Sequence, residues 1–215
     1  PQPLHAASAL QIGHDGQLQV YESEAEFRAS LPGWQAREEA GIAFNHLKGD
    51  EIAAYQPGLA PSFPYATFTP EWQSISDPRD YVLAMAERFR AGGGEITITR
   101  AERLVAGGVE TSDGFIPGRV VLAAGAHSHH LARTAGVKIP LETERGYNTT
   151  LPAGAFDLKR QITFGGHGFV ISKVGDGLRV GGAVELGGLD LPPNFARADA
   201  MLKKAKRFLP GLDTS

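Results

Sequence analysis

The stretch RVVLAAGAHSHHLARTAGVKIPLETERGY, residues Arg119–Tyr147, decides the predicted fold. Within it, Val120–Leu122 have the pattern of a strand buried on both faces, but Ala123–Ala126 then offer no side chain larger than a methyl group. Small residues at the end of a strand allow another group to approach the backbone closely. A bound ligand or a tightly packed helix can occupy that space, and the residues by themselves leave both explanations open.

The composition excludes several classes of protein. With 215 residues, 42% of them hydrophobic, the chain can bury the core of one large domain or of two small ones. A net charge of -3 without long charged runs argues against a nucleic-acid partner, and no apolar run approaches the roughly 20 residues that span a bilayer. The absence of cysteine excludes disulfides and thiolate chemistry. We expect a globular, cytoplasmic protein.

Helices are predicted at three main places. A capping box, Ser23 with Glu26, predicts a brief helix near the start, and a last helix begins near Asn194. Between them, Asp77 and Pro78 predict the first turn of a helix that the glycines at 92–94 end. The apolar stripe predicted for this middle helix consists of Val82, Met85, Ala86 and Phe89. The stripe predicted for the last helix consists of Phe195, Ala198, Leu202, Ala205 and Leu209.

Strands are predicted on both sides of residue 140. Before it, EITIT at 95–99, a hairpin at 103–111 and a long strand at 115–125 follow the middle helix, while 57–72 read as irregular with one edge strand. After it, four runs separated by glycine-rich turns predict an antiparallel sheet: ERGYNTTL, RQITF, GFVISKV and GLRVGGAVEL. The predicted fold class is α+β, with one part derived from an α/β domain.

Familiar catalytic motifs are absent. A dinucleotide-binding chain of this strand and helix order is expected to carry G-x-G-x-x-G at its first strand-to-helix turn, and no such motif occurs here. The crowded residues His127, His129 and His130, with His167 as a fourth candidate, lack the spacing of a metal site and read better as surface polar residues. G-x-S-x-G is also missing. We therefore assign no catalytic residue and no metal ligand.

The quoted stretch carries a resemblance when it is taken together with three other segments. These are GLRVGGAVELGG, QPGL at 56–59 and DPRDYVLAMAERFRAGGGEIT from residue 77. In this order and spacing they resemble the central part of the FAD-dependent D-amino acid dehydrogenases, within the D-amino acid oxidase and glycine oxidase superfamily. The superfamily's N-terminal dinucleotide motif and C-terminal segment have no counterpart in the chain, which begins at Pro1 and ends just past a predicted helix. We therefore expect a central piece of a longer protein.

The resemblance implies an antiparallel-sheet substrate domain with an interleaved, partial FAD-binding domain. Residues 1–76 and 140–215 would form the two parts of the substrate domain, and residues 77–139 the returning section of the FAD-binding domain. It also implies that Ala124, Gly125 and Ala126 let the backbone approach FAD, and that the backbone around Ala101 lies near the adenine. Tight strand-on-helix packing remains the alternative explanation for these small residues.

The substrate wall would come from HGFVIS and LRVGGAVE. Relatives place a tyrosine that holds the substrate carboxylate where this chain has Phe169, so His167 or Tyr147 would take over the polar contact, or specificity would differ. Gly182 would permit close approach by substrate or flavin. For His167 an exposed turn residue in a glycine-rich loop is the alternative. Arg145 is expected either in an ion pair with Glu142 or Glu144 or near the flavin.

For the whole protein, the resemblance implies oxidation of the Cα–N bond of a D-amino acid or cyclic imino acid by hydride transfer to FAD. The alternatives are a relative acting on a 2-hydroxy acid or glycerol 3-phosphate, and a non-catalytic binding module on the same fold. The electron acceptor stays unassigned, and peripheral membrane association stays an open alternative. Because the chain offers no phosphate cradle, we expect the 215 residues alone to lack FAD and to be inactive.

Overall fold

The computed structural model describes residues 11–214, which form two compact units. Among these residues the first unit contains 11–87, 146–183 and 194–214, and the second contains 88–145 and 184–193. The chain thus leaves and re-enters the first unit later than the predicted boundaries after residues 76 and 139. The return of 184–193 to the second unit was not anticipated. The assignment of the first unit to substrate binding and of the second unit to FAD binding stays a prediction.

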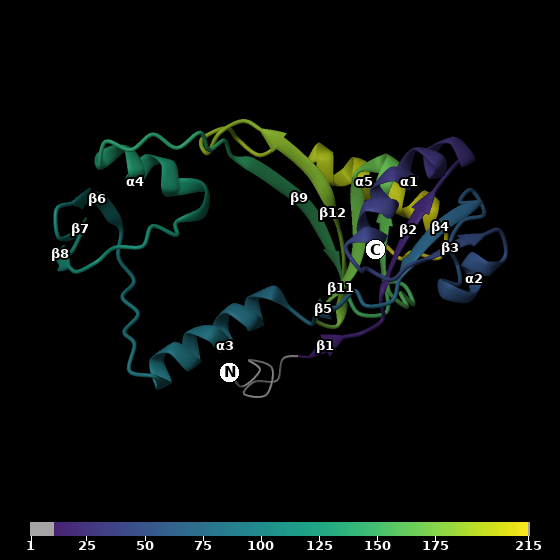
Figure 1. Cartoon of the computed structure of the whole chain (residues 1–215), viewed down its shortest axis with the longest axis horizontal. Helices are drawn as coiled ribbons and strands as arrows, with labels where there is room; N and C mark the ends of the chain where they lie inside the picture. The colour runs from purple at the N-terminus through teal and green to yellow at the C-terminus, as the bar shows by residue number, and fades with distance from the viewer. Residues whose placement is uncertain (1–10, 215) are drawn as a thin grey trace. The chain divides into compact units, whose positions relative to one another are not determined.

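A seven-stranded mixed sheet dominates the first unit (Figure 1). In spatial order its strands are β3 (Asn45–Lys48), β4 (Tyr65–Thr69), β2 (Gln17–Tyr21), β10 (Gln161–Phe164), β11 (Phe169–Val174), β12 (Gly177–Leu186) and β9 (Glu144–Leu151). β2 and β10 run parallel, and β10–β11, β11–β12, β2–β4 and β3–β4 are antiparallel. The strand expected within 57–72 forms as β4, but its predicted place at the edge of a sheet was wrong, because β4 has a strand on each side. A separate short ladder joins β1 (Ile12–Gly13) to β5 (Ser74–Ile75).

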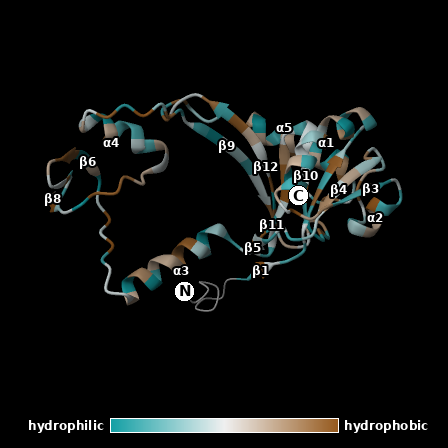
Figure 2. Ribbon diagram, in the orientation of Figure 1, coloured by the Kyte–Doolittle hydropathy of each residue, from teal (hydrophilic) through white to brown (hydrophobic). Residues whose placement is uncertain are grey.

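The hydrophobic core lies on one face of this sheet. Alternate residues of the strands point into it, as the two-residue period of a strand requires, and Figure 2 shows the hydrophobic and hydrophilic positions mixed along the strands. Helix α5 (Ala196–Phe208) packs here, with Phe208 stacked at 5.3 Å on Phe164. The short α2 (Glu51–Tyr55) adds Ile52.

The apolar face of α5 differs in part from the predicted stripe. Ala198, Ala205 and Leu209 are buried as expected, but Phe195 is exposed. Met201 and Phe208 are buried in its place. Phe195 is exposed because α5 begins at Ala196, which leaves Phe195 before the first turn of the helix.

Helix α1 (Glu24–Glu39) covers part of the opposite face of the sheet and is longer than the brief helix predicted. Ser23 caps the helix as predicted, since the Glu26 amide donates to Ser23 Oγ at 3.1 Å. The Glu26 carboxylate reaches one residue further back, where Oε2 accepts from the Glu22 amide at 2.9 Å. Phe27 stacks on Tyr65 at 5.1 Å, and Trp34 Nε1 donates to the Tyr21 hydroxyl at 2.6 Å. Only Phe27 and Trp34 of this helix are buried.

His46 in β3 supplies a prediction about pH. Aromatic neighbours, including Phe27 at 4.9 Å and Phe44 at 5.1 Å, partly bury its ring and lower its pKa, although Glu38 opposes the shift. When a histidine has a lower pKa in the folded state than in the unfolded chain, the unfolded chain takes up the proton first as the pH falls. The stability of the folded protein therefore decreases as the pH falls through the unfolded-state pKa. The stability advantage of wild type over His46→Gln should therefore be smaller at pH 5 than at pH 7.5. Urea unfolding of both proteins at the two pH values measures it, and an equal advantage at both would contradict the lowered pKa.

The second unit contains a three-stranded antiparallel meander of β6 (Ala101–Val105), β7 (Gly108–Thr111) and β8 (Gly114–Pro117). It also holds the 3-10 turn η2 (Gly125–His127) and helix α4 (Ser128–Thr134). The hairpin prediction for 103–111 was right. The strands predicted at 95–99 and through 118–125 were wrong: residues 95–99 and 118–124 lack regular structure, Gly125 begins η2, and Ile98 and Val121 are 91% and 85% exposed. Among residues 11–214 no strand lies beside either segment, so their backbone groups have no ladder to join.

Helix α3 (Pro78–Ala91) starts and stops where the sequence predicts. Asp77 Oδ1 accepts from the Arg79 amide at 2.8 Å, and Gly93, at φ +85°, ends the helix. Its hydrophobic positions are visible in Figure 2, yet no residue of α3 is buried and Val82 is 62% exposed. The predicted apolar stripe is therefore present on α3, but none of the described residues packs over it closely enough to bury it. None of the helices within 11–214 combines the length and the apolar character needed to cross a membrane.

Candidate functional site

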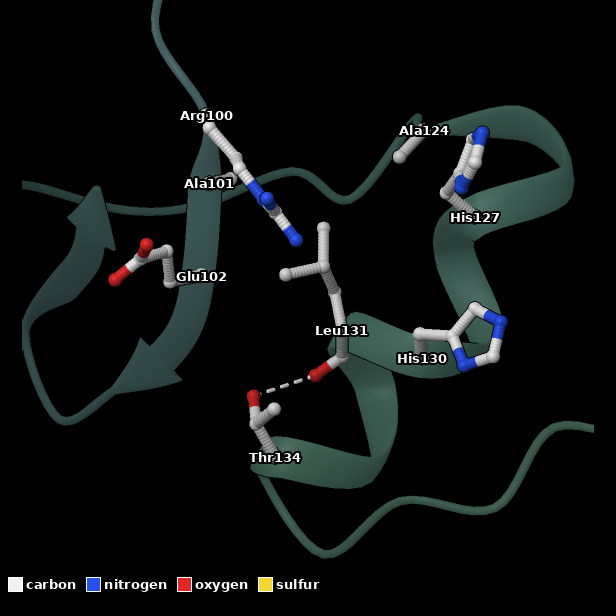
Figure 3. Close-up of a pocket in the computed structure, with 8 residues that line it drawn as sticks. All are labelled: Arg100, Ala101, Glu102, Ala124, His127, His130, Leu131 and Thr134. Carbon is white, nitrogen blue, oxygen red and sulfur yellow. Dashed lines mark hydrogen bonds between the residues drawn. The ribbon is translucent and has the colours of Figure 1, made fainter. Parts of the chain in front are cut away.

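A pocket of about 770 Å³ opens in the second unit between β6 and α4 (Figure 3). Its volume falls within the roughly 300–1,000 Å³ typical of ligand sites. One side comes from β6 and the residue before it, and the other from η2 and α4. The lining residues are Arg100, Ala101, Glu102, Ala124, His127, His130, Leu131 and Thr134.

Thr134 holds the two sides of the pocket together. Its hydroxyl donates to the Leu131 carbonyl at 2.6 Å and accepts from the Leu104 amide at 2.9 Å, which ties α4 to β6. Arg100 is anchored through its own backbone, because its carbonyl accepts from the Ser112 amide at 2.9 Å. The strand side of the pocket is therefore continuous with the meander.

Two of the four predicted cofactor residues line this pocket. Ala101 and Ala124 come from different segments of the chain and meet in it, each with only a methyl group. Gly125 and Ala126 follow in η2 but are not part of the lining. At Gly125 a φ of +51° favours glycine, and a Cβ added there would meet no protein atom within 4 Å, so tight packing among the described residues does not explain this glycine. Close approach of FAD to its backbone stays a prediction.

The lining side chains suit a ligand that carries both charge and hydroxyl groups. Arg100, His127 and His130 can donate hydrogen bonds to anionic oxygens, and the Glu102 carboxylate can accept from hydroxyls. Leu131 and the two alanines add apolar contact. No two of the lining side chains, all within the described residues, hydrogen-bond to one another. The pocket therefore has the character of a binding site, without a paired nucleophile and base.

Sequence reasoning missed most of this lining. His127 and His130 were weighed only as metal ligands or surface residues, and Arg100, Glu102 and Thr134 were not considered. A helical pattern could have found three of these residues: Thr134 and His130 lie seven and three residues after His127, which places all three along one side of a helical stretch. That side follows directly after the small residues at 123–126. No comparable pattern marks Arg100 or Glu102.

The predicted substrate-wall residues lie in the first unit, and two of them, Phe169 and Tyr147, are buried. Phe169 is 2% exposed and stacks on Phe164 at 4.6 Å within the core. Among the described residues its ring is covered, and its place on the substrate wall stays a prediction. Tyr147 is also buried, and its hydroxyl accepts from the Asn194 amide at 2.7 Å.

His167 lies 6.5 Å from Phe169, ring to ring, at the end of the 3-10 turn η3 (Gly165–His167). Its Nε2 is 2.8 Å from Glu22 Oε2, and its ring lies 4.7 Å from that of Phe208. Arg207 approaches the other oxygen of Glu22 at 3.6 Å. The histidine thus links η3 to the end of β2 and to α5. His167 therefore lies in a turn, as the alternative expected, but it is largely covered and paired rather than exposed. A substrate contact stays a prediction.

Gly182 and Arg145 take structural positions. A Cβ at Gly182 would collide with the Gly168 carbonyl oxygen and with backbone and side-chain atoms of Phe169, so the neighbouring turn and β11 already require glycine here. Close approach by substrate or flavin stays a prediction. Arg145 forms the expected ion pair, but with Glu185 at 3.6 Å in place of Glu142 or Glu144, and it donates to the Leu189 carbonyl at 3.3 Å. This side-chain pair is largely buried within the second unit.

Comparison with known proteins gives a consistent result. A family model described as FAD dependent oxidoreductase matches residues 4–215. The chain is 32% identical over 207 residues to a D-amino-acid oxidase of Bradyrhizobium diazoefficiens, covering 94% of this chain and 49% of that protein. It is 32% identical over 209 residues to a D-amino acid dehydrogenase of Paramagnetospirillum magneticum, covering 91% and 49%.

Among solved structures, glycine oxidase from Geobacillus kaustophilus superposes with a TM-score of 0.86 at 19% identity, covering 96% of this chain and 58% of that one. At this identity the likeness establishes the fold. The chain spans about half the length of the curated relatives it matches.

Proposed function

Since the chain belongs to the FAD dependent oxidoreductase family, we propose that the whole protein oxidises the Cα–N bond of D-amino acids or cyclic imino acids. FAD, when bound, supplies the acceptor for the hydride. This family is FAD-dependent, and two relatives that share 32% identity with the chain are named for D-amino acids. The proposal makes this chain responsible for part of the cofactor site and part of the substrate site.

The observation that carries the proposal is the convergence of Ala101 and Ala124 in one pocket. The family resemblance picks out both positions for FAD, and in the second unit they line the same cavity. The residues there fit one end of a dinucleotide: methyl groups leave room for a flat base, Glu102 can accept from ribose hydroxyls, and Arg100 and His127 can donate to phosphate oxygens.

The proposed role of the first unit is to hold the substrate. Phe169 has no hydrogen-bond donor, which leaves Tyr147 and His167 as the polar candidates for the substrate carboxylate, although the Tyr147 side chain is also buried among the described residues. Each already has a partner, the Asn194 amide for the tyrosine and Glu22 for the histidine. A substrate carboxylate would have to compete with these contacts, so we propose that specificity differs from that of relatives with a tyrosine at position 169.

An absorbance spectrum of the whole protein tests the cofactor, and a substrate screen with an artificial electron acceptor tests the reaction. The screen should contain D-amino acids, cyclic imino acids, 2-hydroxy acids and glycerol 3-phosphate. We expect a flavin spectrum and turnover of members of the first two groups. A colourless protein would remove the redox function altogether. A yellow protein that turns over only hydroxy compounds would keep the family and overturn the proposed substrate.

Ala124→Leu provides a residue-level prediction for the cofactor pocket. The larger side chain would fill space that the alanine leaves open, so FAD affinity of the whole protein should fall about tenfold or more, which corresponds to about 1.4 kcal/mol. Ala106→Leu is the matched control, because Ala106 is exposed in the turn between β6 and β7 of the same unit and lies outside the pocket lining. Fluorescence titration of the apoprotein with FAD measures both, with circular dichroism to confirm equal folding. Equal affinities for the two variants would remove the pocket from the cofactor site.

A further inference from the structure

A polar patch occupies the face of the seven-stranded sheet that points away from the core. It is built by Gln17 and Gln19 of β2, Thr69 of β4 and Thr163 of β10. Gln17 lies opposite Thr69, Gln19 lies opposite Thr163, and Gln17 Nε2 donates to Thr163 Oγ1 at 2.7 Å. Gln17 and Thr69 are each only 6% exposed. The Gln17–Thr163 hydrogen bond offsets part of the free-energy cost of burying these polar groups, and the glutamine and threonine side chains keep further donors and acceptors for a ligand.

Helix α1 passes over the patch without filling the space beneath it. Of its 16 residues only Phe27 and Trp34 are buried, and the indole of Trp34 is held by its hydrogen bond to Tyr21. A cavity of about 230 Å³ remains between the helix and the strands. Besides the four polar residues, its lining consists of Trp34, Arg37, Ile42 and Trp72.

The cavity carries a positive charge that no acidic residue balances. The Arg37 guanidinium lies 4.7 Å from the centre of the Trp34 ring, and its Nη1 donates to the Gly33 carbonyl at 2.9 Å. Within residues 11–214 no carboxylate lies at ion-pair distance from it. A guanidinium has five N–H donors, so most of its donors remain available to an anion.

The cavity also has an apolar wall. Ile42 and Trp72 line it and keep much of their surface exposed. An aromatic or aliphatic group of a ligand placed against them would be removed from water. Since the cavity is smaller than the roughly 300–1,000 Å³ pockets that hold drug-sized ligands, its ligand would also be smaller.

We propose that this cavity is a binding site for a small organic carboxylate that bears an apolar group. The carboxylate accepts from Arg37, the amides and hydroxyls of the polar patch complete its hydrogen bonds, and the apolar group lies against Trp72 and Ile42. The site belongs to the first unit and shares no lining residue with the pocket proposed for FAD. It is therefore independent of the proposed redox function.

Tryptophan fluorescence tests the proposal directly, because the only two tryptophans of the chain, Trp34 and Trp72, both line the cavity. The 215-residue chain is titrated with three probes that share one ring: phenylacetate, phenylacetamide and phenethylamine. We expect a saturable change with phenylacetate, and affinities at least about tenfold weaker for the neutral and the cationic probes. No saturable change with phenylacetate, or equal affinity for phenylacetamide, would overturn the proposal.

Two variants and a matched control locate the binding. Arg37→Gln should weaken phenylacetate binding at least about tenfold, and Thr163→Val should weaken it several-fold. Arg28→Gln removes an arginine from the same helix that pairs with Glu24 and does not line the cavity, so its affinity should equal that of wild type. Wild-type affinity in Arg37→Gln would place any binding elsewhere. Circular dichroism establishes that each variant is folded, and Arg37, exposed on the helix surface, can be replaced without opening the core.

Discussion

Phe208→Ala is expected to lower the free energy of unfolding of the first unit by about 3–5 kcal/mol, as for other large aromatic residues truncated in a core. Phe208 is fully buried at the end of α5. It stacks on Phe164 at 5.3 Å and meets Phe63 edge to face at 4.9 Å. Truncation would remove both contacts and leave a cavity where the helix joins the sheet. The ring is also the apolar neighbour of His167.

Urea unfolding measured by tryptophan emission gives this free energy, because both tryptophans lie in the first unit. Phe195→Ala is the control: it removes the same side chain from an exposed position next to the start of the same helix. Its effect should stay below about 1 kcal/mol. Similar losses for the two variants would mean that the aromatic cluster does not hold α5 to the sheet.

Gly182→Ala is expected to lower the free energy of unfolding by about 3 kcal/mol, at the upper end of the usual range for overpacking. The added Cβ would collide with the Gly168 carbonyl oxygen and with Phe169, which belong to the neighbouring turn and strand. Backbone atoms cannot move aside as the end of a flexible side chain can. Adjustment would therefore separate β11 from β12 or displace the buried Phe169 ring.

Gly146→Ala provides the matched control for this position. Gly146 also lies in a strand, β9, but a Cβ built there meets no atom within 4 Å. Alanine should be neutral or slightly stabilising at that site, because it reduces the conformational entropy of the unfolded chain. Chemical unfolding of the two variants in parallel measures the contrast. A Gly182→Ala protein as stable as Gly146→Ala would return Gly182 to a role in ligand approach.

The sequence by itself determined the elements whose cause is local. β9 and β12 begin and end where their alternating patterns predict, and the Asp77 cap and the Gly93 stop bound α3 as expected. The bounds of the two strands follow the alternation of side chains along the chain, and those of the helix follow its cap and its glycine stop. The family resemblance likewise rests on residues in order along the sequence, and the matched family confirms it.

Only the tertiary structure decided which faces are covered and which side chains meet. The segments at 95–99 and 118–125 have the composition of strands, but a strand exists only beside a partner, and none of the described residues supplies one. Phe169 and Trp34 are equally plausible as wall or core residues until the neighbouring elements are placed. The two pockets are likewise invisible in the sequence, because each joins residues from distant segments, as Ala101 joins Ala124 and Gln17 joins Thr163. Local patterns set how an element is built, whereas burial and binding depend on contacts between elements that no local pattern records.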